Sequence, residues 1–126
     1  MGTTLAASEG LIMKCLWDSK QDLTVAELVD RLKTLYGKEY AMNSVATFMT
    51  ILMKKGFVTR YKIKGSYQYQ PLISKQAYLD SQTEEARNDW YDGSVYGMMA
   101  SLVKTSGGIT EEEAQKLKEL LDEYTN

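Results

Sequence analysis

The 126-residue chain contains no histidine, one cysteine and one proline. Without histidine, Ser-His-Asp and Cys-His catalysis are excluded, and the commonest metal ligand is missing. With Cys15 as the only thiol, no disulfide can form within the chain. Cys15 falls on an apolar helix face, where a thiol is expected to be buried rather than to sense redox state. We therefore predict that the chain is not an enzyme and that it uses no cofactor and no metal.

Long apolar runs are also missing. No stretch approaches the ~18 residues that a membrane-spanning helix requires. Residues 1–20 lack the charged start and the apolar stretch of a signal peptide. The composition, 44% hydrophobic and 25% charged, is typical of a globular domain. We therefore expect a cytoplasmic protein without a membrane partner.

The small net charge of −2 hides an uneven distribution. Residues 1–75 hold 11 Lys and Arg against 6 Asp and Glu, whereas residues 76–126 hold 4 against 11. Between Glu39 and Asp80 there is no acidic residue. The cations in that stretch are Lys54, Lys55, Arg60, Lys62, Lys64 and Lys75. Such a stretch attracts a polyanion, although a solvated basic face opposite an acidic one is the alternative interpretation.

Apolar spacing predicts a first helix over residues 8–18 and a second helix that opens at Thr24. Thr24 and Glu27 form a capping box, in which each side chain accepts a hydrogen bond from the other residue's amide. Gly37 is expected to end the second helix. On its buried side this helix is predicted to carry Leu28, Leu32 and Leu35.

A third helix is predicted over residues 43–55, with Asn43 or Ser44 as its cap and Gly56 after its end. The period then changes to alternation in residues 57–62 and 66–70, which are rich in β-forming residues. This change predicts a hairpin with Ile63, Lys64 and Gly65 as its turn, closed by Pro71.

Three helices followed by a basic hairpin are the pattern of a winged helix-turn-helix domain. In that architecture the third helix enters the major groove and the hairpin, or wing, lies along the phosphates. The expected fold class is therefore mostly α with a small β-hairpin wing. We predict a DNA-binding domain over residues 1–73 and a helical dimerisation region over residues 74–126.

The dimerisation region is predicted to hold helices over residues 74–91 and 94–104, and a last helix that opens at Thr110 with a second capping box. The acidic residues at 111–113 suit the N-terminal dipole of that helix better than a metal ion. Three short helices form too small a core alone, so we expect them to dock on a second copy of the chain. The predicted interface residues are Val95, Met98, Met99, Leu102, Leu117, Leu120, Leu121 and Tyr124.

The candidate DNA-binding residues fall into two groups. On the exposed face of the third helix, Asn43 can pair with adenine, and a threonine methyl can contact the thymine methyl. The base-reading group is Asn43, Ser44, Thr47 and Thr50. The phosphate-binding group is Lys54, Lys55, Arg60, Lys62 and Lys64. The alternatives are helix capping or simple exposure for the hydroxyls, and solubility for the cations.

Several short motifs occur in a fixed order along the chain. They are Leu16-Trp17, residues 23–28 (LTVAEL), 44–47 (SVAT), 54–58 (KKGFV), 67–74 (YQYQPLIS), 92–94 (DGS) and 109–121. In this order and spacing the chain resembles the penicillinase-repressor family of winged-helix regulators, which includes the methicillin-resistance regulator. The resemblance implies a homodimeric repressor that binds inverted repeats of double-stranded operator DNA in promoters.

The chain also departs from that family. Asn43 and Ala46 stand where members often carry Lys or Arg, and Ile51 stands where Arg is common. The exposed face of the third helix is therefore polar but nearly uncharged. This feature keeps a second hypothesis open, a winged-helix module for protein–protein contact with weak or no sequence-specific DNA binding.

The resemblance leaves the inducing signal open. Some family members are inactivated by a sensor protease that cuts an Asn–Phe bond in the fifth helix. That position reads Ser101-Leu102 here, so the cleavage site is not carried over. Copper-responsive members carry Cys-x-Cys motifs near the C-terminus, which residues 122–126 lack. A ligand-responsive regulator is the other possibility, since the aromatic-rich stretch 90–96 suits a cavity wall as well as interface packing.

Overall fold

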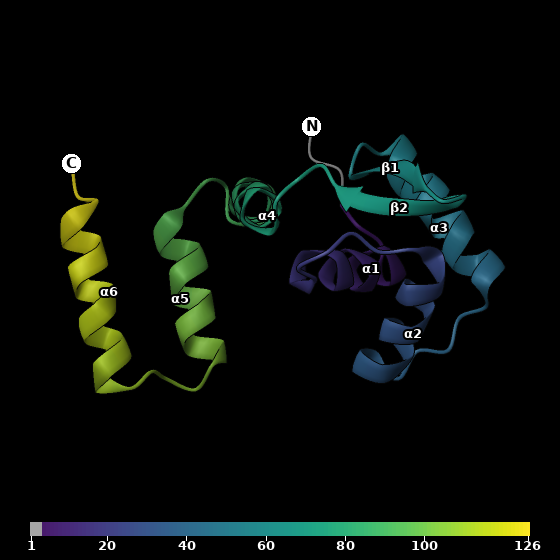
Figure 1. Cartoon of the computed structure of the whole chain (residues 1–126). Helices are drawn as coiled ribbons and strands as arrows, with labels where there is room; N and C mark the ends of the chain where they lie inside the picture. The colour runs from purple at the N-terminus through teal and green to yellow at the C-terminus, as the bar shows by residue number, and fades with distance from the viewer. Residues whose placement is uncertain (1–3) are drawn as a thin grey trace. The chain divides into compact units, whose positions relative to one another are not determined.

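Six helices and one hairpin make up residues 4–126, the part of the chain that this computed structural model describes (Figure 1). Residues 1–3, the start of the predicted first domain, lie outside the described residues. The chain divides into two compact units, Met1–Gln82 and Thr83–Asn126, which we call the N-terminal and C-terminal units. In order, the elements are α1 Ala7–Asp18, α2 Val25–Tyr36, α3 Met42–Lys54, β1 Val58–Ile63, β2 Ser66–Pro71, α4 Lys75–Trp90, α5 Val95–Thr105 and α6 Glu111–Glu123.

The predicted capping box at the start of α2 is confirmed. The Glu27 amide donates to Thr24 Oγ1 at 3.2 Å, and the Thr24 amide donates to Glu27 Oε1 at 2.9 Å. Gly37 ends the helix in the left-handed conformation, with φ of 64°. The prediction that Leu35 is buried is wrong, because its side chain is 57% exposed.

The reason lies in the full width of the apolar stripe. Besides Leu28 and Leu32, the stripe includes Val25, Val29 and Tyr36, which pack against the core. With 100° between successive residues around the helix axis, Leu35 lies at the edge of the stripe formed by these five positions, whereas Tyr36 lies close to its centre. The last turn of α2 therefore buries its tyrosine in place of the leucine.

The prediction that Asn43 or Ser44 caps α3 is also wrong. The cap position is Ala41, which makes no side-chain hydrogen bond, and the helix begins at Met42. The preceding residue, Tyr40, shares a hydrogen bond with the Ser8 hydroxyl at 2.9 Å. Its ring also packs edge-on against Phe48, with centroids 5.6 Å apart. These tertiary contacts fix the entry of the chain into α3 earlier than the local capping preference indicates.

The predicted hairpin is confirmed with shifted ends. β1 and β2 pair antiparallel, from Val58 opposite Pro71 to Ile63 opposite Ser66. Ile63 belongs to the strand, so the turn is the two residues Lys64 and Gly65, with φ of 50° and 85°. Positive φ at both positions is the geometry of a type I′ turn, which suits the twist of a hairpin.

The hairpin is fastened to the link between α1 and α2. Leu23 and Tyr69 form an antiparallel bridge, in which Tyr69 N donates to Leu23 O at 2.8 Å. Both side chains lie in the core of the N-terminal unit. The buried apolar residues are Ile12, Met13, Cys15, Leu16, Leu23, Leu28, Leu32, Val45, Met49, Leu52, Phe57, Val58 and Tyr69. The core thus holds α3 and the base of the wing on one framework.

The helix α4 runs across the division between the units, and α5 and α6 follow it. Ser74 Oγ accepts from the Ala77 amide at 3.0 Å at the start of α4, the helix predicted over residues 74–91. Thr110 Oγ1 accepts from the Glu113 amide at 3.1 Å, which is one half of the predicted second capping box. None of residues 83–126 is buried.

Candidate nucleic-acid interface

One face of α3 lies open to solvent. The exposed residues on it are Asn43, Ser44, Thr47, Thr50 and Lys54. Thr47 and Thr50 each donate their hydroxyl hydrogen to the carbonyl four residues earlier, at 3.0 and 3.2 Å. Each oxygen thereby keeps its remaining lone pair for an outside donor, and each methyl group stays available for apolar contact. This face offers one amide, three hydroxyl oxygens and two methyl groups, which are groups of a kind that can contact base edges.

The opposite face of α3 anchors the helix. Val45, Met49 and Leu52 are fully buried at the spacing of one helical face. Together they fix the rotation of the helix about its own axis, so the polar face keeps its direction. Rigid presentation of this kind limits the entropy that a binding helix loses on contact with its target.

An ion pair holds the end of α3 to α1. Lys55 Nζ donates to Glu9 Oε1 at 2.7 Å, and the Ala6 amide donates to the same oxygen at 3.0 Å. Burial alone raises the pKa of Glu9, but the hydrogen bonds from Lys55 and Ala6 and the charge of Lys55 outweigh it, so the pKa is lowered. The charge of Lys55, predicted to contact phosphate, is therefore engaged within the protein. Glu9 was not a candidate, because no local signal links residues 46 positions apart.

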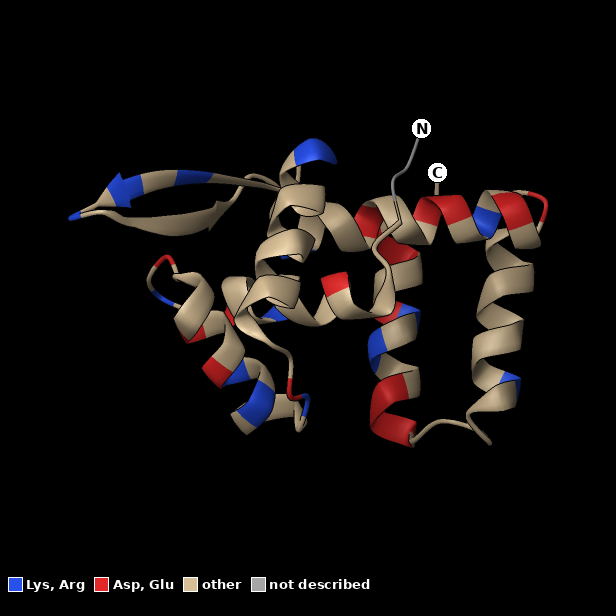
Figure 2. Ribbon diagram, turned by 90° about the vertical axis from the view of Figure 1, so that its right-hand side faces the viewer, with Lys and Arg blue, Asp and Glu red and all other residues tan. Residues whose placement is uncertain are grey.

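The wing carries exposed cations and no acidic residue. Arg60, Lys62 and Lys64 are all exposed. Figure 2 shows blue segments and no red one on the hairpin, whereas α3 is tan over most of its length. The helix α3, with Lys54 as its one charged residue, is therefore nearly uncharged, whereas the hairpin is positive.

Two tyrosines that the sequence analysis did not single out organise the wing cations. The register sets Arg60 opposite Tyr69 and Lys62 opposite Tyr67, so these four side chains share one face of the hairpin. The Arg60 guanidinium lies 3.7 Å from the centre of the Tyr67 ring and donates to the Tyr69 hydroxyl at 3.3 Å. Lys62 Nζ lies 5.0 Å from the same Tyr67 ring. The alternation of charged and aromatic residues was the available signal for this arrangement.

On the other face of the hairpin, a hydrogen bond ties the wing to the link before α2. The Tyr61 hydroxyl donates to Asp22 Oδ2, and this bond raises the pKa of Tyr61. Together with the Leu23–Tyr69 bridge, it anchors the wing at two places on one short segment. The cations of the wing are thus carried on an element whose base is fixed.

The predicted dimer-interface residues lie on α5, α6 and the turn after α6. Leu102 is 64% exposed and Tyr124 is 73% exposed. Val95, Leu120 and Leu121 are exposed as well, while Met98, Met99 and Leu117 are half-buried. Trp90 and Tyr96, from the aromatic stretch, are the most exposed large hydrophobic residues among those that the structure describes. The C-terminal unit therefore presents much apolar surface to solvent.

The described residues form neither a metal-binding cluster nor a membrane-spanning helix. Among residues 4–126, no three His, Cys, Asp or Glu side chains are grouped so that they could hold a metal ion. Within the same residues, no helix combines the length and the apolar character needed to cross a membrane. Cys15 is fully buried and free, as predicted, and burial raises the pKa of its thiol.

The sequence model of the family described as penicillinase repressor matches residues 5–123. The penicillinase repressor of Bacillus licheniformis is 23% identical over 115 residues, which are 91% of this chain and 87% of that protein. The methicillin resistance regulatory protein MecI of Staphylococcus aureus (strain N315) is 20% identical over 118 residues, 94% of this chain and 93% of that protein. These relatives are described as regulators rather than enzymes, in agreement with our prediction.

Two solved structures share the fold. The solution structure of the DNA-binding domain of the repressor BlaI has a TM-score of 0.50 and 21% identity, over 62% of this chain and 94% of that one. The complex structure of hsRosR-S4 has a TM-score of 0.54 and 15% identity, over 90% of this chain and 92% of that one. At such identities they show the fold alone, and the predicted winged helix-turn-helix fold is confirmed.

Proposed function

This chain belongs to the penicillinase repressor family, and on that premise we propose that it is a dimeric transcriptional repressor that binds a roughly palindromic operator in a promoter. In each protomer, residues 43–55 read bases in a major groove, and the wing at residues 57–70 lies on the flanking phosphates. Because promoter DNA is its target, we propose that it acts in the cytoplasm.

One observation carries this proposal, namely the joint presence of a polar helix face and an acid-free basic hairpin on one core. The uncharged face of α3 supplies groups for base edges, and the wing supplies charge for the backbone. Arg60, Lys62, Lys64 and the helix residue Lys54 are the exposed cations that we assign to phosphate contact. We assign Lys55 a positioning role, because its ammonium group is bound to Glu9.

The dimer is supported by the C-terminal unit. Val95, Leu102, Leu120, Leu121 and Tyr124 remain exposed there although they are apolar or aromatic. A second copy of the same helices covers such surface by two-fold symmetry, which also matches a palindromic site. The proposal includes no cleavage by a sensor protease, since Ser101-Leu102 does not match the Asn–Phe pair.

Fluorescence anisotropy tests the DNA-binding proposal. Duplex DNA from upstream of the protein's own gene is titrated with the full chain at several salt concentrations, and a scrambled duplex of equal composition is the control. We expect tight binding that weakens steeply with salt and that favours the native duplex by at least tenfold.

The same titration distinguishes the rival function. Equal binding to both duplexes would remove the base-reading role of α3 and leave only backbone attraction. Absence of binding would overturn the repressor function, and the uncharged face of α3 would then favour a protein-contact module. In that case, recovery of one stoichiometric protein partner that requires residues of α3 would support the rival.

A further inference from the structure

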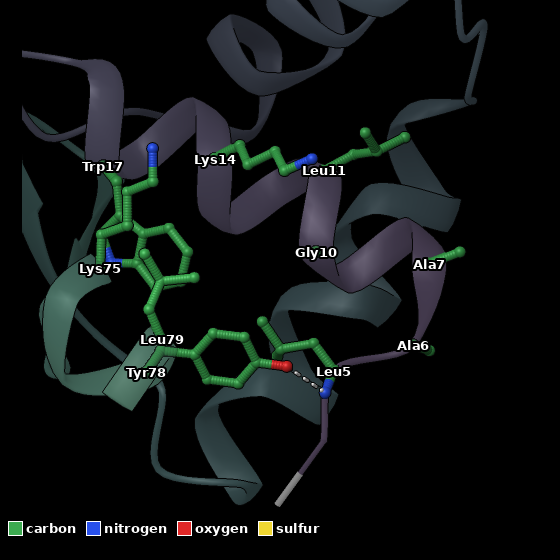
Figure 3. Close-up of a pocket in the computed structure, with 10 residues that line it drawn as sticks. All are labelled: Leu5, Ala6, Ala7, Gly10, Leu11, Lys14, Trp17, Lys75, Tyr78 and Leu79. Atoms are coloured by element: carbon green, nitrogen blue, oxygen red, sulfur yellow. Dashed lines mark hydrogen bonds between the residues drawn. The ribbon is translucent and has the colours of Figure 1, made fainter. Parts of the chain in front are cut away.

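A pocket of about 440 Å³ lies within the N-terminal unit, bounded by the segment before α1, by α1 itself and by the first turns of α4 (Figure 3). This volume falls in the range of small-molecule sites, roughly 300–1,000 Å³. Its walls are mainly apolar, with Leu5, Leu11, Trp17 and Leu79 among the lining residues. None of the proposed DNA-contact or dimer-interface residues lines it.

Hydrogen bonds hold the aromatic wall in place. The Trp17 indole N–H donates to the Ile73 carbonyl at 2.8 Å, and the Leu5 amide donates to the Tyr78 hydroxyl at 3.1 Å. The Trp17 and Tyr78 rings lie with centroids 5.9 Å apart, and Figure 3 shows them together on one side of the pocket. The indole N–H and the hydroxyl oxygen thus each have a partner within the protein, and the carbon atoms of both rings contribute to the wall.

Gly10 leaves the pocket open from the α1 side. A Cβ placed on this residue meets no atom within 4 Å, although Gly10 lies inside a helix and lines the pocket. Glycine is a poor helix former, so nothing in the local preference of α1 favours it. Any larger side chain at this position extends into space that is now empty.

The charges around the pocket are of one sign. Lys14 on α1 and Lys75 at the start of α4 line it, and no acidic residue does. Neither lysine has an ion-pair partner among residues 4–126. An apolar interior that is also lined by two lysines without ion-pair partners is complementary to a molecule with an apolar body and one anionic end.

From these observations we propose that the pocket binds a small amphipathic carboxylate, with its hydrocarbon part against Trp17 and Gly10 and its carboxylate beside Lys14 and Lys75. Octanoate serves as the probe, and octanamide, which has the same chain without the charge, serves as its matched control. In the Trp90→Phe variant, Trp17 is the sole tryptophan, so its emission reports on the pocket. Calorimetry on the unmodified full chain gives the stoichiometry.

We expect one octanoate per chain, a shift in Trp17 emission, and affinity about fivefold or more above that of octanamide. In the double variant Lys14→Gln/Lys75→Gln, octanoate should fall to the affinity of octanamide, while octanamide stays within twofold. Lys20→Gln is the matched control, since Lys20 is exposed and lies outside the pocket. Gly10→Leu should abolish binding of both probes, whereas Gly10→Ala should retain most of it.

Three results would overturn the proposal. One is that octanoate does not bind at any concentration below that at which it forms micelles. A second is that octanoate and octanamide bind equally well, since the lysines then contribute nothing and the pocket prefers neutral apolar molecules. The third is wild-type binding of octanoate by Gly10→Leu, since the site would then lie elsewhere. Should Gly10→Leu fail to fold, the comparison between the double lysine variant and Lys20→Gln decides. None of these readouts involves DNA, so the pocket is tested independently of the repressor function.

Discussion

At the scale of single residues, the ion pair between Glu9 and Lys55 connects the end of α3 to α1. The Glu9 side chain is 7% exposed and that of Lys55 is 29% exposed, so both charges have lost much of their water. A buried carboxylate is tolerated only with partners, and Glu9 has the ammonium of Lys55 and the amide of Ala6. The pair therefore stabilises the position of the α3 end, and it removes one charge from the surface that would contact DNA.

Replacement of Lys55 by methionine should show how much the ion pair contributes to stability. The variant leaves the Glu9 carboxylate buried without its cation, so we expect the free energy of unfolding at pH 7 to fall by about 2 kcal/mol. Urea denaturation measures this loss. Lys54→Met is the matched control, because Lys54 is the exposed neighbour, and it should change the free energy by less than about 0.5 kcal/mol. Equal effects of the two substitutions would contradict the role of the pair.

The Lys55→Met variant should also reverse the sign of the contribution that Glu9 makes to the pH dependence of stability. In the wild type the folded-state pKa of Glu9 is lowered, so its stabilisation is present above the usual glutamate pKa and is lost as the pH falls through the folded value. Without Lys55, burial dominates and raises the pKa of Glu9, so acid should partly restore the stability of the variant. Unfolding curves between pH 4 and pH 7 should show the difference between wild type and variant narrowing toward pH 4. A constant difference over this range would contradict the account.

Asn43 should act on sequence preference rather than on general affinity. Its side chain is exposed on α3, and a bidentate amide contact to adenine contributes about 1–3 kcal/mol of discrimination. We expect Asn43→Ala to weaken binding to the native upstream duplex by roughly tenfold and to leave the scrambled duplex within twofold. Anisotropy titrations at one salt concentration measure both. Equal losses on the two duplexes would exclude base reading by this residue.

At the scale of elements, period and turn chemistry predicted every helix and the hairpin, and they also predicted which face of α3 is exposed. The start of α3 was missed because Tyr40 bonds to Ser8, a contact between residues 32 positions apart. The engagement of Lys55 was missed for the same reason. The local sequence pattern thus predicts the elements and their exposed faces. The contacts that fix a helix end or pair with a charged side chain come from tertiary packing.

Phosphate contact by the wing can be measured through the salt dependence of DNA binding. If Lys62 and Lys64 each contact one phosphate, alanine at either position should lower the slope of log affinity against log salt by about one. The loss should be the same on native and scrambled duplexes, since phosphates carry no sequence. Lys38→Ala is the control, an exposed lysine of the α2–α3 link outside the wing, and its slope should match the wild type. Unchanged slopes for both wing variants would remove the wing from the DNA.

At the scale of the whole molecule, charge and apolar surface are divided between the two units. The N-terminal unit holds the acid-free stretch between Glu39 and Asp80, while most acidic residues lie in the C-terminal unit. The C-terminal unit has no buried residue, so its helices lack the core that normally offsets the entropy of folding. The N-terminal unit thus has a core of its own, whereas the C-terminal unit would gain one under the proposed dimerisation.

The exposed apolar surface of the C-terminal unit leads to a prediction about dimerisation. Leu117 and Leu121 lie on one side of α6, half-buried and 53% exposed, and aspartate at either position would place a charge in the proposed apolar contact. Because an unpaired charge is expensive to bury, we expect Leu117→Asp and Leu121→Asp to be monomers by multi-angle light scattering. Gln115→Asp introduces the same charge on an exposed position of the same helix and should remain a dimer.

The monomers should also lose the native-duplex preference, since one protomer contacts a single half-site. A dimer that survives both leucine substitutions would move the interface off this face of α6. The exposed residues Val95 and Leu102 of α5 would then be the next candidates for the interface.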